Sequence, residues 1–179
     1  MPLNPILFPN GGFAFANDET YFTLEPSKNT GDYEMVTFSF LSNGKRLEHA
    51  MQRVETYTRK LLGEGTFVDM FIVAISELLS NPVKHSKKNH RVTVNIFSIP
   101  DQVLLVSVTD KAGPLDIQHI NTSPILADGS LNLEEHGRGF FIMIQASDVV
   151  GYCPHAGSNL KEIFLGLNLE RRKGEHATD

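Results

Sequence analysis

The stretch Thr66–His85, TFVDMFIVAISELLSNPVKH, does most to decide the fold. From Phe67 to Leu79 it is apolar almost all round, which is typical of a helix buried in a protein core. Met70 and Phe71 are expected there as core side chains. The sequence therefore predicts a central helix, with the rest of the domain packed around it.

Pro82 interrupts the polar end of this stretch. Proline lacks the N–H of a helical residue, and its ring clashes with the carbonyl four residues earlier. It also pushes the preceding residue away from helical geometry. We therefore expect a kink or a helix end near Leu79 to Asn81.

The flanking segments alternate between strand and helix patterns. Upstream, Glu34–Phe40 alternates like a strand, and apolar residues recur at helical spacing from Leu47 to Leu62. Downstream, the patterns predict strands at 91–99, 102–109, 148–153 and 160–169, and a helix at 137–146. Helices and mostly antiparallel strands together predict an α+β fold, a sandwich of two layers.

The chain divides into three parts by composition. Residues 1–32 are rich in Asn, Gly and Pro; they form either a loose arm or a hairpin of Phe13–Ala16 with Thr20–Leu24. Residues 33–170 form the main domain, and residues 171–179 a charged tail. Within the domain, Lys111–His136 shows no clear period, and an irregular stretch of this length is usually functional.

The composition of the chain excludes several classes of protein and partner. The chain has 179 residues, of which 41% are hydrophobic and 21% charged, so a wholly disordered chain is excluded. A net charge of −5 argues against a broad grip on nucleic acid. A single cysteine fits a reducing compartment. We see neither a signal peptide nor an apolar run of membrane-spanning length, so we expect a cytoplasmic protein without membrane or nucleic-acid partners.

Three polar residues lie four apart on the central helix: Glu77, Asn81 and His85. This spacing puts them on one helix face. A carboxylate and an amide on an otherwise apolar helix need a partner, and Mg²⁺ prefers such oxygen ligands. Alternatively, the three residues lie on a solvated edge of the helix.

A carboxylate also ends the second predicted hairpin strand. Asp110 follows an apolar run and precedes Gly113, where backbone can approach a ligand closely. Its carboxylate suits an exocyclic amine such as that of adenine. The alternative is an ordinary transition from strand to turn.

The third motif is His136-Gly137-Arg138-Gly139 at the start of the last predicted helix. A helix N-terminus exposes N–H groups and a positive dipole end, and Arg138 adds a cation suited to phosphate. The alternative is a glycine-rich entry to a helix with a surface arginine.

In this order the three motifs resemble those of the GHKL, or Bergerat-fold, ATPases. The sequence is most similar to the anti-sigma-factor serine kinases among them, over roughly residues 34–169. The resemblance is carried by the stretches 75–85, 108–116, 135–148 and 157–163. It implies a two-layer α/β sandwich with helices on one face of a mixed, mostly antiparallel sheet.

The resemblance also implies a role for each motif, with ATP and Mg²⁺ bound. Glu77 would be the general base, Asn81 the Mg²⁺ ligand and Asp110 the group that recognises adenine. The lid over the nucleotide would be Lys111–His136. The remaining nucleotide-binding positions would be His85, Gly113, Gly137, Arg138 and Gly139.

Members of this family phosphorylate a serine or threonine of a small antagonist protein. They also hold a sigma factor and are commonly homodimers, so we expect these partners here. Pro82 and Ala112 depart from the family pattern. They motivate a second hypothesis, in which the chain is a module of the same fold that captures a partner protein without turnover.

Overall fold

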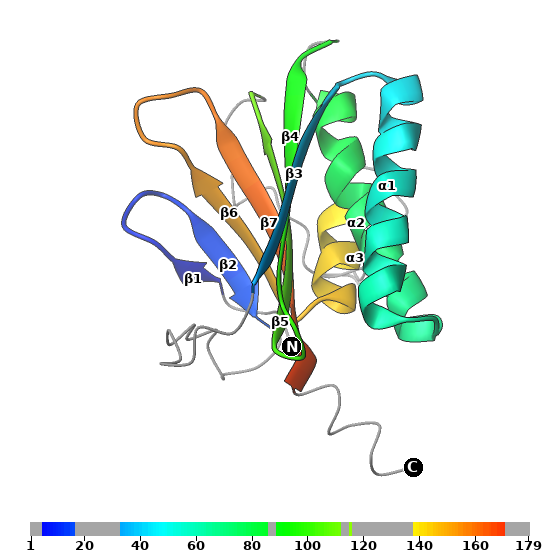
Figure 1. The fold of residues 1–179 in the computed structure, drawn as a ribbon. Coiled ribbons are helices and arrows are strands. Elements are labelled where there is room, and N and C mark those ends of the chain that lie inside the picture. The colour runs from blue at the N-terminus through cyan, green and yellow to red at the C-terminus, as the bar shows by residue number, and fades with distance from the viewer. Residues whose placement is uncertain (1–4, 17–32, 86–88, 112–114, 116–137, 171–179) are drawn as a thin grey trace, which may run out of the picture.

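The computed structural model describes residues 5–16, 33–85, 89–111, 115 and 138–170 (Figure 1). These residues form an α+β sandwich of two layers, with one sheet covered on a single face by helices. This is the architecture that the resemblance implies. The predicted boundary near residue 32 and the predicted tail fall outside the described residues.

The sheet has seven strands in the order β1-β2-β6-β7-β5-β4-β3. All of its described pairs are antiparallel, so the expected mixture of directions is wrong. The strands are β1 (Ile6–Leu7), β2 (Phe13–Ala16), β3 (Glu34–Leu41), β4 (Arg91–Ile99), β5 (Val103–Asp110), β6 (Val149–Pro154) and β7 (Lys161–Asn168).

One face of the sheet is the floor of the core. Side chains of a strand alternate between faces, so each strand contributes every second residue. Ile96, Val106 and Leu165 lie side by side across β4, β5 and β7, and each is fully buried. Burial of such a side chain contributes roughly 1.5–3 kcal/mol. The strands predicted at 91–99, 102–109 and 160–169 are therefore confirmed.

Three helices cover that face: α1 (Gly44–Leu62), α2 (Thr66–His85) and α3 (Arg138–Ala146). Asn43 caps α1, because its side-chain oxygen accepts a hydrogen bond from the N–H of Arg46 at 3.1 Å. Gly63 ends α1 with a φ of 80°, a conformation that favours glycine. The helix α1 between Asn43 and Gly63 confirms the helix predicted from the spacing of apolar residues.

The predicted end of α2 near Leu79 to Asn81 is wrong. The helix continues through Pro82 to His85. Proline removes only one helical N–H, and Pro82 is itself buried, so its ring gains packing. Asn81 therefore stays on the same helix as Glu77.

Met70 is also not the core side chain that the sequence predicts. It is 48% exposed and Val73 is 51% exposed, whereas Phe71 is fully buried as expected. Because α2 packs beside both α1 and α3, the side of α2 away from the sheet faces outward. By length and composition α2 is apolar enough to cross a membrane, but a core helix passes the same test.

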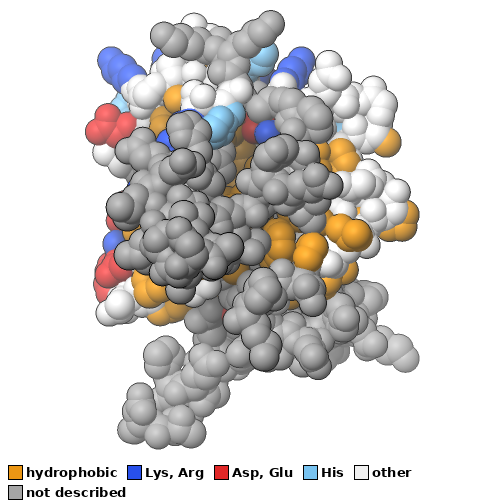
Figure 2. Space-filling model, turned by 180° about the vertical axis from the view of Figure 1, so that it is seen from behind, with side chains coloured by type: hydrophobic (Ala, Val, Ile, Leu, Met, Phe, Trp, Pro, Cys, Tyr) orange, Lys and Arg blue, Asp and Glu red, His pale blue; other side chains and the backbone are white. Residues whose placement is uncertain are grey.

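The N-terminal hairpin differs from the predicted one. Phe13–Ala16 is a strand, but it pairs with Ile6–Leu7 and with β6, and Thr20–Leu24 lies outside the described residues. Phe13 and Phe15 are buried in the core. Figure 2 shows hydrophobic side chains on the flank of the molecule where β1 and β2 lie, and Leu7 there is 70% exposed.

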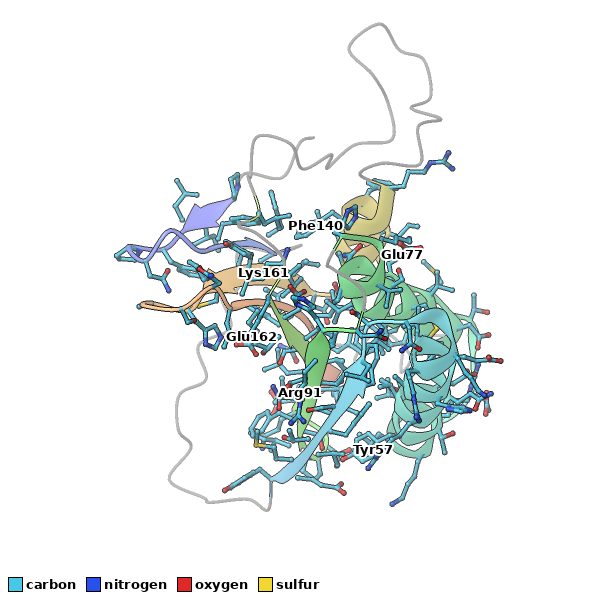
Figure 3. The ribbon with its side chains drawn as sticks, turned by 90° about the horizontal axis from the view of Figure 1, so that it is seen from above. Tyr57, Glu77, Arg91, Phe140, Lys161 and Glu162 are labelled. Atoms are coloured by element: carbon cyan, nitrogen blue, oxygen red, sulfur yellow. The ribbon has the colours of Figure 1, made fainter. Side chains whose placement is uncertain are left out.

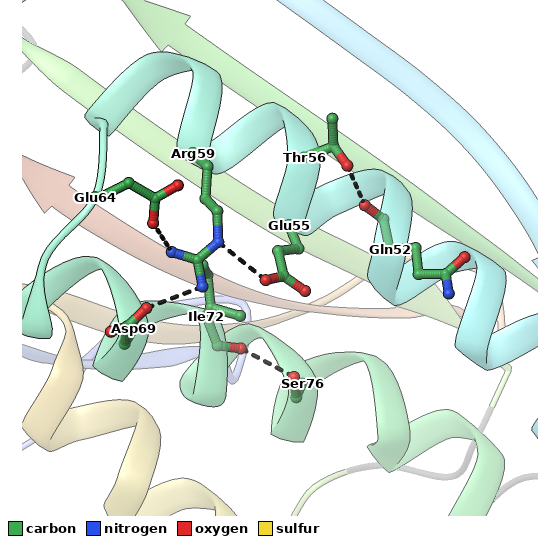
Figure 4. A network of polar contacts seen from close by, with 8 residues as sticks. All are labelled: Gln52, Glu55, Thr56, Arg59, Glu64, Asp69, Ile72 and Ser76. Carbon is green, nitrogen blue, oxygen red and sulfur yellow. Dashed lines mark hydrogen bonds and ion pairs between the residues drawn. The ribbon is translucent and has the colours of Figure 1, made fainter.

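Arg59 joins the end of α1 to the start of α2 (Figure 4). Its guanidinium donates to Glu55 and Asp69 at 2.9 Å each and also contacts Glu64. Hydrogen bonds to Glu55 and Asp69 raise the pKa of Arg59 above its ordinary value. This network holds the turn between the two helices in place.

Candidate functional site

The topology brings the three sequence motifs to one end of the sheet. The C-terminal end of α2 leads into the start of β4, and Thr93 near that start pairs with Thr109 near the end of β5. Antiparallel pairing then puts the start of β7 beside the end of β5. The end of α2 and the end of β5, where Asp110 lies, are therefore at the same end of the sheet.

The structure places two of the motif residues, Glu77 and Gly139, in direct contact. A Cβ atom added to Gly139 would lie 2.9 Å from Oε2 of Glu77. Figure 3 shows Glu77 and Phe140 close together on neighbouring helices. The carboxylate of Glu77 thus lies at the N-terminus of α3, where the helix dipole stabilises negative charge. Any side chain at position 139 would compete with this carboxylate for space.

Glu77 has a second charged neighbour on its own helix. Nζ of Lys84 lies 3.3 Å from Oε2 of Glu77, two turns further along α2. The Glu77 side chain is 28% exposed, so the carboxylate remains accessible from solvent. The glutamate therefore lies between two positive groups, the ammonium of Lys84 and the N-terminus of α3.

Asn81 and His85 continue the same face of α2. Asn81 is half-buried one turn beyond Glu77, and His85 is exposed at the helix end. The predicted face is therefore present. The face is half-buried at Glu77 and Asn81 and exposed at His85, so it combines the two interpretations of the sequence.

Asp110 ends β5 on the face of the sheet that the helices cover. It is only 2% exposed, and its cross-strand partner on β7 is Lys161, which is 8% exposed. Burial lowers the pKa of Lys161 from its ordinary value, and the charge of Asp110 partly opposes that shift. A buried carboxylate beside a buried ammonium thus forms the second part of the site.

Sequence reasoning missed Lys161, although a signal was present. Lys161 is in phase with Ile163, Leu165 and Leu167, which are all buried, so strand alternation alone predicts that it points inward. Its pairing with Asp110 required the strand order, which puts β7 next to β5.

The buried lysine gives the protein a characteristic pH dependence. Because the pKa of Lys161 is lower in the folded protein than in the unfolded chain, the native state binds fewer protons just below pH 10.5. The free energy of unfolding should therefore gain a contribution that rises with pH in that window. At pH values below the pKa of Lys161 in the folded protein, the lysine is charged in both the folded and the unfolded state. The folded state then bears the full cost of removing that charge from water.

Urea unfolding from about pH 8 to about pH 10.5 tests this. The difference in stability between the unmodified protein and a Lys161→Gln variant should shift in favour of the unmodified protein as the pH rises. A pH-independent difference would mean that Lys161 titrates as in the unfolded chain.

The other predicted site residues are only partly described. Arg138 begins α3 and is exposed. Gly113, Gly137 and most of the predicted lid lie outside the described residues. Leu115 within that lid donates its N–H to the hydroxyl of Tyr152 at 3.4 Å, which ties the segment after Asp110 to β6.

The oxygen atoms on α2 at this end of the sheet are of the type that Mg²⁺ prefers as ligands. The amide of Asn81 and the carboxylate of Glu77 are hard oxygen ligands one helical turn apart. Among the described residues no group of three or more His, Cys, Asp or Glu is arranged to hold a metal ion. A small number of protein ligands is normal for Mg²⁺ that is also bound by phosphates.

Comparison with known proteins adds little. No known family model matches the sequence, and no curated protein is similar to it at a significant level. Among solved structures, one similar chain is the mycobacterial sensor histidine kinase MprB, with 15% identity and a TM-score of 0.45. The match covers 75% of this chain and 97% of that chain. At this level the likeness has no bearing on function.

Proposed function

We propose that this chain is a Mg-ATP-dependent serine/threonine protein kinase of the GHKL type. One observation carries the proposal: the carboxylate of Glu77 lies at the glycine-rich start of α3, at the end of the sheet where Asp110 is buried. These are the positions that the family motifs require for a base, a phosphate site and an adenine acceptor. The proposal is thus supported by the resemblance in sequence together with this contact.

The nucleotide would be bound at its two ends by different elements. Asp110 accepts a hydrogen bond from the adenine amine, beside Lys161 on the neighbouring strand. The N-terminus of α3 offers backbone N–H groups and a positive dipole end to the phosphates, and Arg138 adds its cation. Bound Mg²⁺ would supply charge neutralisation to the phosphates, with Asn81 as its ligand.

Glu77 acts as general base toward the protein substrate. Its carboxylate takes the proton of a serine or threonine hydroxyl while the hydroxyl oxygen bonds to the γ-phosphorus. The bond between that phosphorus and the bridging oxygen breaks, and ADP leaves with the electron pair. Lys84 and the N-terminus of α3 hold the Glu77 carboxylate in position from two sides. The substrate would be a small antagonist protein in a circuit that also involves a sigma factor.

A second candidate function is partner capture without turnover. The ion pair between Lys84 and Glu77 favours it, because Nζ of Lys84 occupies an oxygen of the carboxylate that would have to accept the proton of the substrate. In that case nucleotide would be a structural ligand, or would not bind.

Thermal unfolding with Mg-ATP tests nucleotide binding first. Ligand at about 100 times its dissociation constant adds roughly 2.7 kcal/mol to the stability of the folded state. We expect a rise in Tm with ATP plus Mg²⁺ and a smaller one with Mg-GTP, whose base lacks the adenine amine. No rise at millimolar ATP would reject the kinase and leave only partner capture.

A further inference from the structure

A groove runs between β3, at the edge of the sheet, and helix α1. Two adjoining hollows of about 380 Å³ and about 610 Å³ form it, and both are lined by Phe38, His49 and Arg53. Its floor is apolar, since Val36 and Ile96 also line it. Tyr57 of α1 points towards β3 from the wall of the groove (Figure 3).

The walls of this groove are basic. The basic side chains that line the two hollows are Arg46, His49, Arg53, Lys60 and Arg91. Among the described residues no carboxylate lines either hollow, and Glu34 lies close to the hydroxyl of Tyr57 at one end. In a chain of net charge −5, this concentration of cations is a local feature of the groove.

The side chain of Arg53 is exposed, but its guanidinium lies over an aromatic ring of the floor. Its guanidinium carbon lies 4.6 Å from the centre of the Phe38 ring, a cation–π contact. A planar guanidinium fixed in this way is suited to a carboxylate, which it can bind with two parallel hydrogen bonds. The groove therefore combines an apolar floor with a cation already positioned in it.

The backbone of β3 offers a third element of recognition. β3 is the last strand of the sheet, and among the described residues no strand pairs with its outer edge. Such an edge presents N–H and C=O groups to another extended chain. Its 8 residues span roughly 26 Å, enough for a strand of similar length.

We propose that this groove binds an acidic, extended segment of a partner protein, which adds to the sheet beside β3. Backbone hydrogen bonds to the edge supply affinity, and alternate side chains supply specificity. Apolar side chains of the segment pack on Val36 and Phe38, and its carboxylates meet Arg46, Arg53 and Arg91. The groove does not include Glu77 or Asp110, so this proposal is independent of the kinase function.

Other occupants fit less well. A second copy of the chain, paired through the same edge, would bring two rows of cations together and repel. A nucleic acid would use the cations but not the backbone edge or the apolar floor. An acidic peptide uses all three features.

Fluorescence anisotropy with the full chain tests the proposal. The probe is a labelled peptide of 8 residues, the length of β3, with alternating glutamate and valine. It should bind at low salt, and binding should weaken as salt rises. Replacing its glutamates by glutamine, or methylating its alternate backbone nitrogens, should each weaken binding about fivefold or more.

Two matched variants locate the site. Arg53→Gln should weaken peptide binding about fivefold, while Lys45→Gln, the same charge change on an exposed residue of α1 outside the groove, should not. If both variants lost the same amount of peptide affinity, the effect would come from net charge alone, which would overturn the proposal. Three other results would also overturn the proposal. The glutamine peptide could bind with unchanged affinity, or a single-stranded oligonucleotide of equal charge could bind more tightly. Self-association of the chain that displaces the peptide would be the third.

Discussion

Replacing Glu77 by glutamine is expected to slow phosphate transfer by about 10²–10⁴-fold, the usual contribution of a general base. The amide keeps the size of the side chain at the start of α3, where a Cβ on Gly139 would lie only 2.9 Å from Oε2. Nucleotide binding should therefore change little. The assay follows transfer of labelled γ-phosphate to a candidate antagonist protein, with nucleotide binding measured alongside.

Glu162→Gln is the matched control for this experiment. Glu162 is a partly exposed glutamate on β7, next to Lys161 in sequence and on the opposite face of the sheet, where it pairs with His155 at 3.5 Å. It should transfer phosphate at the unmodified rate. If Glu77→Gln also transfers at that rate, Glu77 is not the base and the partner-capture function is favoured.

The second large effect is expected at Asp110. Asp110→Asn should weaken ATP binding roughly 10- to 100-fold, because a hydrogen bond to a charged group contributes about 1.5–3 kcal/mol. It should also reduce the preference for ATP over GTP. Calorimetric titration with both nucleotides measures the two effects.

This substitution leaves Lys161 buried beside a neutral amide, so the variant is expected to be less stable. Asp110→Asn combined with Lys161→Gln removes both charges and separates lost stability from lost binding. Asp148→Asn is the matched control, since Asp148 lies at the opposite end of the sheet and accepts a hydrogen bond from the N–H of Asn168 at 2.8 Å. Unchanged ATP affinity in the double variant would remove Asp110 from the adenine site.

Much of the fold follows from local patterns in the sequence. Alternation identifies β3, short apolar runs between turn residues identify β4 to β7, and helical spacing with Asn43 and Gly63 at its ends identifies α1. These signals are read within a single element, where the period of the side chains is set by the backbone. The errors at Met70 and Pro82 arise because exposure and helix length depended on packing against neighbouring elements.

The sequence names candidate site residues one by one, but it does not give their arrangement in space. The motifs name Glu77, Asp110 and Gly139, yet the contact between Glu77 and Gly139 joins positions more than sixty residues apart. The pairing of Asp110 with Lys161 needed the order of strands in the sheet. The basic groove beside β3 has no sequence signal of its own, because its cations come from two separate elements, α1 and β4.

A structure of the chain bound to an unreactive ATP analogue and Mg²⁺ tests the central claim most directly. The account predicts adenine hydrogen-bonded to Asp110 and phosphates at the start of α3, beside Gly139 and Arg138. A nucleotide bound elsewhere, such as in the groove between β3 and α1, would contradict it. So would the lack of any bound nucleotide at saturating concentration.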